Sequence, residues 1–147
     1  MNKNNEFLTA ALEYLEKGFY IFPLKPKSKA PLTSNGFKGA SNSPEQIRAW
    51  WAQYPDANIG VATGQISGIF VLDIDGDNFP KTLMPADVSY SVKTSKGHHV
   101  YFYVPKGVRI RCRTKLHGYD ADIRGDGGYI VAPPSIHPDG GRYEFCD

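Results

Sequence analysis

Cysteine and long apolar runs are scarce in this chain. Its 147 residues include only two cysteines, Cys112 and Cys146, and no apolar stretch is long enough to cross a bilayer. Two cysteines alone make neither a zinc site nor a disulfide framework. Residues 1–5 lack the apolar core of a signal peptide. These absences predict an intracellular, cytoplasmic protein with reduced thiols, no zinc and no membrane partner.

Excess charge of one sign is also absent. The formal net charge is only +2, so any nucleic-acid partner must be bound by a local basic patch and not by overall basicity. Apolar content of 41% and charged content of 22% are typical of a globular protein. The length predicts one domain, residues 1–147.

The hydrophobic pattern places helices first and strands afterwards. Apolar residues recur at helical spacing over 6–17, and again after the capping sequence Ser43-Pro44-Glu45-Gln46. Short apolar or alternating runs dominate the rest of the chain, and this order predicts an α+β domain. Strands are expected over 19–24, 58–64, 68–75, 99–104, 108–115, 120–124 and 129–132, with loops over 25–42 and 76–90.

The segment Val71-Leu72-Asp73-Ile74-Asp75-Gly76 is the most informative, because two carboxylates follow an apolar run typical of a buried strand. Side chains alternate along a strand, so Asp73 and Asp75 are expected on one face. Two such anions repel each other unless a cation lies between them, which favours a divalent metal site. Alternatively, the strand ends before the acids and both are solvated turn residues. A calcium loop is excluded, because its sixth and twelfth positions hold Asn78 and Met84.

Two further segments carry residues suited to a nucleotide site. The turn Thr94-Ser95-Lys96-Gly97 offers a hydroxyl, an ammonium group and backbone N–H groups to phosphate, and His99 opens the next strand. Asp122 supplies a third carboxylate for Mg²⁺ or Mn²⁺, although Asp120 competes for that role and Arg124 can pair with either. Each signal is weak alone, since an ordinary polar turn and a buried sheet histidine would have the same sequence.

Five segments that together span nearly the whole chain occur in one order: GFYIFPLKPKSKAPLTSNGFKGAS, PEQIRAWWAQYPDANIGVATG, SGIFVLDID, TSKGHHVYF and DIRGDGGYIVAPPS. In that order they resemble the primase–polymerase domain at the N-terminus of replication proteins of plasmids, phages and integrated elements. This domain belongs to the archaeo-eukaryotic primase superfamily. The resemblance implies an RNA-recognition-like antiparallel sheet that carries the acids, packed with an N-terminal α/β unit.

The resemblance also implies an activity, namely template-dependent nucleotidyl transfer by a DNA primase/polymerase that uses two Mg²⁺ or Mn²⁺ ions. Its partners would be dNTPs or rNTPs, a single-stranded DNA template with its primer, and a helicase domain or protein. The implied catalytic residues are Asp73, Asp75, Asp122 and His99, of which the three acids hold the metals. The expected nucleotide-binding residues are Ser95, Lys96, His99 and Arg124.

The chain departs from the family pattern at two places. Lys96 stands where many relatives have a second glycine, which would tighten phosphate contact or change the loop. The chain also ends at Asp147, sooner than expected, as an excised or reduced domain would.

A basic segment follows the proposed site residues. Arg109, Arg111 and Arg113 alternate over 108–115, which places them on one face of the expected strand. They would follow the template backbone independently of its sequence, and the alternative is a solvated edge strand protected by its charge.

Two other functions stay open. One is a catalytically silent module that binds nucleic acid or nucleotide. The other is a rolling-circle nickase, whose metal needs two histidines separated by one apolar residue. Here His98 and His99 are adjacent and would point to opposite faces, which disfavours the nickase.

Overall fold

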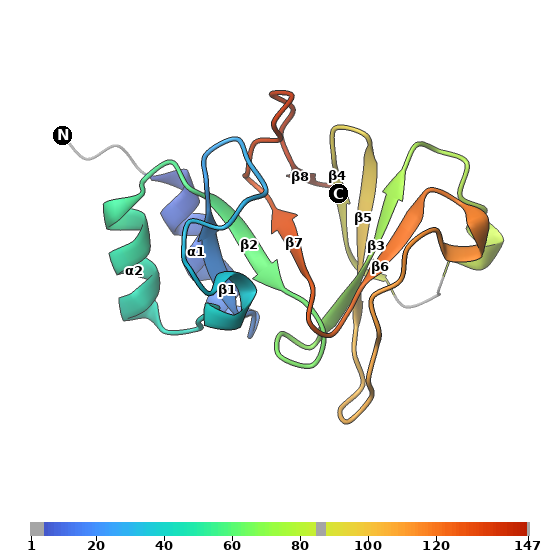
Figure 1. Cartoon of the computed structure of the whole chain (residues 1–147), viewed down its shortest axis with the longest axis horizontal. Coiled ribbons are helices and arrows are strands. Elements are labelled where there is room, and N and C mark those ends of the chain that lie inside the picture. Colours follow the sequence, from blue (N-terminus) through green and yellow to red (C-terminus); the bar gives the residue numbers. More distant parts are fainter. Residues whose placement is uncertain (1–4, 85–87, 147) are drawn as a thin grey trace.

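The computed structural model describes residues 5–84 and 88–146 and arranges them as two antiparallel sheets (Figure 1). Two helices pack against the smaller sheet, at the left of Figure 1. The predicted α+β class is therefore confirmed, while a specific likeness to an RNA-recognition sheet stays a prediction, as does the single domain. Within the described ranges, no helix has the length and apolar character needed to span a bilayer.

The helices are α1 (Glu6–Glu16) and α2 (Pro44–Gln53), and short 3-10 turns occur at η1 (Gly36–Gly39), η2 (Lys81–Leu83) and η3 (Leu116–Gly118). The smaller sheet has the order β1-β2-β7, with β1 (Ile21–Leu24), β2 (Asn58–Ala62) and β7 (Tyr129–Ala132). The larger sheet has the order β6-β3-β5-β4-β8, with β3 (Ile69–Asp75), β4 (Val88–Lys93), β5 (Gly97–Tyr103), β6 (Ala121–Arg124) and β8 (Glu144–Phe145).

Both helices begin where the sequence provides a capping side chain. The Asn5 side chain accepts hydrogen bonds from the backbone N–H groups of Phe7 and Leu8 at the start of α1. The Ser43 hydroxyl accepts from the backbone N–H of Gln46 at the start of α2. These bonds satisfy donors that a helix leaves free at its N-terminus, so the predicted helix starts are confirmed.

One face of the larger sheet packs against the smaller sheet, and this contact positions the acids. Ile69 and Val71 on β3 and Tyr101 on β5 are fully buried in the main core. Because side chains alternate along a strand, Asp73 and Asp75 are the next residues on the same face of β3. On this face of β3, the first part of the strand is therefore buried in the main core and the last part carries the two acids.

The opposite face of the larger sheet covers a second, smaller core. Its buried members are Leu72, Ile74, Val100, Phe102 and Ala121. Apolar residues on both faces explain why β3 reads as a continuous apolar run in the sequence.

One predicted strand and one predicted loop need correction. The segment 108–115 is not a strand, because it makes only two isolated bridges, from Arg111 to Asp126 and from Arg113 to Ile123. A left-handed Lys115, with φ of 49°, ends the extended course there. The loop predicted over 76–90 is wrong from Val88 onward, where β4 begins, and its residues 85–87 lie outside the described part of the chain.

Candidate active site

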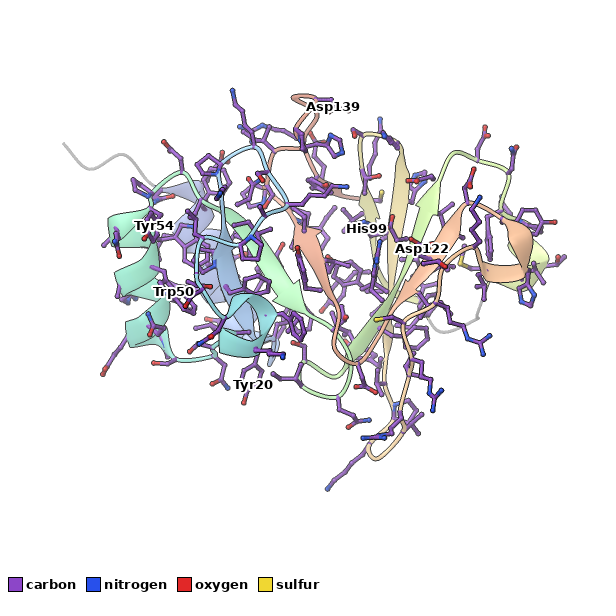
Figure 2. The ribbon with its side chains drawn as sticks, in the orientation of Figure 1. Tyr20, Trp50, Tyr54, His99, Asp122 and Asp139 are labelled. Atoms are coloured by element: carbon purple, nitrogen blue, oxygen red, sulfur yellow. The ribbon has the colours of Figure 1, made fainter. Side chains whose placement is uncertain are left out.

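Three of the predicted site residues lie side by side across three strands. Asp73 on β3 pairs in register with His99 on β5 and with Asp122 on β6. In Figure 2 the His99 side chain lies between the two sheets, and Asp122 lies on β6. Antiparallel pairing therefore brings these three residues, which are far apart in the sequence, into one row across the sheet.

A network of ion pairs joins the members of this row. The Asp73 Oδ1 atom lies 3.3 Å from Nε2 of His99. The Nη2 atom of Arg124 lies 3.5 Å from Oδ2 of Asp73 and 3.2 Å from Oδ2 of Asp122. A guanidinium group thus stands between the carboxylates of Asp73 and Asp122, whereas the charge argument placed a cation between Asp73 and Asp75.

The surroundings of Asp73 favour its ionised form. Burial of this carboxyl raises its pKa, but the hydrogen bond and the charge of His99 act in the opposite direction. The cations Arg124 and Lys29 add to the lowering, so the pKa of Asp73 ends below its usual value. Asp73 is therefore a carboxylate near neutral pH.

The acids enclose a pocket of about 330 Å³. Its lining residues are Asp73, Asp75, Thr114, Lys115, Asp120 and Asp122. Asp122 is the acid in register with Asp73, and its Oδ1 accepts the backbone N–H of Lys115 at 3.1 Å. Asp120 lies one step outside this row, 74% exposed, with a 3.9 Å contact to the Lys115 ammonium group.

The donor set of this pocket fits Mg²⁺ or Mn²⁺ in its chemistry, because such ions prefer carboxylate oxygens, water and phosphate oxygens. Across residues 5–84 and 88–146, however, no three His, Cys, Asp or Glu side chains are already spaced to hold a metal. The guanidinium group of Arg124 contacts one oxygen of each of Asp73 and Asp122. The residues fit the chemistry of such an ion, and a metal bound by these two oxygens would have to replace Arg124.

The predicted phosphate turn lies at the end of β5, beside the acids. Gly97 pairs in register with Asp75, and a Cβ atom there would lie 1.9 Å from the backbone oxygen of Ile74. The turn is closed by the Thr94 hydroxyl, which accepts the Gly97 N–H at 3.0 Å. Only glycine, which has no Cβ atom, permits this close approach of the two backbones. Ser95 and Lys96 are exposed at the tip of the turn.

The arginines of the 108–115 segment do not join this site. Arg109, Arg111 and Arg113 are all exposed and line a separate hollow beside β6. Among the adjacent histidines, His98 is exposed and His99 is buried, in agreement with the predicted opposite orientations.

A second pocket, of about 350 Å³, meets the acidic pocket at Asp73. Both sheets contribute to it, and its lining includes His99, Arg124, Lys29, Phe37, Cys112, Tyr129 and Tyr143. No role in the site was predicted for Lys29, Tyr129 or Tyr143. The only signal in the sequence was the repeated lysine at Lys25, Lys27 and Lys29, and this repeat does not indicate which part of the molecule the loop faces.

Two buried groups in this second pocket stand out. The Nδ1 atom of His99 is buried and has no hydrogen-bond partner among the described residues. The Tyr143 ring lies beside that histidine, with the ring centroids 5.8 Å apart. Burial raises the pKa of Tyr143 to about 12, and the negative charges of Asp73 and Asp139 act in the same direction. The Tyr143 side chain, whose ring lies beside His99, is therefore neutral near neutral pH.

Residues 11–147 match the family model described as bifunctional DNA primase/polymerase, N-terminal. The chain belongs to this primase–polymerase family. No curated protein matches it. Membership supports nucleotidyl transfer of the primase/polymerase type in general, with nucleotides and DNA as the substrates that the family implies.

Proposed function

We propose that this primase–polymerase domain extends a primer on a single-stranded DNA template by two-metal catalysis, with dNTPs or rNTPs as substrates. The replicated molecule would be a plasmid, a phage genome or an integrated element, and a helicase domain or protein would open the duplex. The observation that supports the proposal most is the row of Asp122, Asp73 and His99 across three adjacent strands, with Asp75 on the same face.

The acids would hold the metals. Bound at Asp73, Asp75 and Asp122, two Mg²⁺ or Mn²⁺ ions would activate the primer 3′-hydroxyl and neutralise charge on the triphosphate. Asp73 contributes a carboxylate that is already ionised, because its pKa is lowered. Arg124, once it leaves the two acids, has its guanidinium donors free for a phosphate oxygen.

The remaining residues would hold the nucleotide and the template. His99 lines the second pocket and its Nε2 atom faces Asp73, so its ring would lie against the phosphates of a bound nucleotide. Ser95 and Lys96 are exposed at the turn beside the acids, where a triphosphate reaches them. The arginines Arg109, Arg111 and Arg113 would contact template phosphates without reading the sequence.

A primer-extension assay tests this function. The purified domain is given a labelled primer on a DNA template, Mn²⁺ or Mg²⁺, and either dNTPs or rNTPs. We expect extension that requires both template and metal. A domain that binds nucleotide and single-stranded DNA but never extends the primer would instead support the silent binding module.

A further inference from the structure

The loop that carries Lys29 is held in place by side chains of two strands of the smaller sheet, β2 and β7. The Tyr129 hydroxyl on β7 donates to the backbone oxygen of Lys29 at 2.8 Å. Buried Asn58 on β2 donates through Nδ2 to the backbone oxygens of Ser28, at 3.0 Å, and Ile136, at 2.8 Å. The Lys29 backbone is thus fixed, whereas the residue is exposed as a whole.

The position of Lys29 differs from that of the other lysines in the 25–42 loop. It lines the second pocket with Asp73, His99 and Arg124, whereas Lys25, Lys27 and Lys38 do not. Its ammonium group forms no salt bridge with any residue in the described part of the chain. A fixed loop therefore presents to the pocket a cation that forms no salt bridge in the described part of the chain, although its charge acts on Asp73.

The charges of the second pocket call for an anionic ligand. Lys29 and Arg124 are cations, and the only carboxylate in the lining is Asp73, which the proposed function assigns to a metal. With that carboxylate neutralised, the pocket is cationic. Its volume of about 350 Å³ falls within the range of small-molecule pockets, roughly 300–1,000 Å³.

We propose that Lys29 is a substrate-binding residue whose ammonium group contacts a phosphate of the bound nucleotide. The smaller sheet then holds the nucleotide from the side opposite His99 and Arg124, and Tyr129 is a positioning residue that fixes the Lys29 backbone. This inference rests on the proposed function, because it takes the bound ligand to be a nucleoside triphosphate.

The test compares binding of labelled dATP, deoxyadenosine and a single-stranded oligonucleotide in the presence of Mn²⁺. Lys29→Ala should weaken dATP binding roughly tenfold or more, as expected for loss of one charge-assisted contact to phosphate. Binding of deoxyadenosine, which has no phosphate, and of the oligonucleotide should change less than about twofold. Lys29→Arg should restore most of the dATP affinity because it keeps the charge.

Two further variants complete the design. Lys25→Ala removes a cation from the same loop but outside the pocket, and should leave dATP binding within about twofold. Tyr129→Phe keeps the ring and removes only the hydroxyl that holds Lys29, so it should weaken dATP binding about two- to fivefold and deoxyadenosine binding hardly at all.

Several results would overturn the inference. These are unchanged dATP affinity in Lys29→Ala, equal losses for dATP and deoxyadenosine, or a loss confined to the oligonucleotide. A wild-type domain that neither binds dATP nor extends a primer would overturn the proposed function and the Lys29 inference together. Wild-type extension with a fully active Lys29→Ala variant would overturn the Lys29 inference alone.

Discussion

The two pockets that meet at Asp73 differ in charge and in the way the chain builds them. The acidic pocket is lined by β3, β6 and the segment that enters β6, so one local sheet contact assembles it. The second pocket combines residues of both sheets with the Lys29 loop, and it contains two cations. The difference agrees with the division of roles proposed above, in which the acidic side holds metal and the cationic side holds nucleotide phosphate.

The largest effect is expected where the two pockets join. Asp73→Ala should lower nucleotide incorporation at least about a thousandfold, since it removes a metal ligand and the partner of both His99 and Arg124. Primer extension measures the loss, and circular dichroism checks that the variant is folded. The matched control is Asp77→Ala, an exposed acid of the same segment. Near-wild-type extension by Asp73→Ala would contradict the two-metal assignment.

A smaller effect is expected on nucleotide binding alone. His99→Ala should weaken dATP binding about tenfold while template binding changes little, because His99 lines the cationic pocket and the three arginines of the basic segment line a different one. Fluorescence anisotropy with both ligands measures the two affinities. Equal losses for the two ligands would place the histidine at the template and not at the triphosphate.

A still smaller and less selective effect is expected outside both pockets. Arg111→Ala should weaken single-strand binding a few-fold for all sequences and reduce the salt dependence by about one unit of slope, as loss of one phosphate contact does. Titration of an oligonucleotide at several salt concentrations measures this slope. Arg48→Ala, an exposed arginine on α2, serves as the control. An unchanged slope in Arg111→Ala would return the segment to the solvated-surface interpretation.

The smallest effect concerns stability and pH. The pKa of Asp73 is lower in the folded protein than in the unfolded chain, so its contribution to stability is present above the unfolded pKa and lost as pH falls through the folded pKa. Urea unfolding of wild type and Asp73→Asn should therefore show a stability difference at pH 6 that shrinks toward pH 3. A difference that is constant with pH would mean that Asp73 gains nothing from His99 and Arg124.

The two pockets also differ in how far the sequence could predict them, because one is built within a single sheet and the other between the two sheets. Alternation along one strand was enough to place Asp73 and Asp75 on one face, and the neighbouring strand with Asp122 was found from its own pattern. Docking of one sheet on the other brings Lys29 to Asp73, and no local pattern carries that information. Tyr143, far along the chain, was missed for the same reason.

The alternation of side-chain types in the sequence also led to two wrong predictions, at the arginine segment and at β4. The arginine segment alternates like a strand, yet β6 meets it only at the bridge between Arg113 and Ile123, so no ladder forms. In β4, Val88, Tyr90 and Val92 alternate with serines, and this signal was passed over because the preceding residues read as a loop. Alternation indicates a strand only where a partner is available along its whole length.

Linkage between metal and nucleotide tests the central claim most directly. The affinity for dATP is measured with Mn²⁺ and with EDTA, in wild type and in Asp73→Ala. If the two pockets act together through Asp73, Mn²⁺ should raise the dATP affinity of the wild type about tenfold or more, and this gain should disappear in Asp73→Ala. A wild-type affinity indifferent to metal, or an equal gain in Asp73→Ala, would contradict the account.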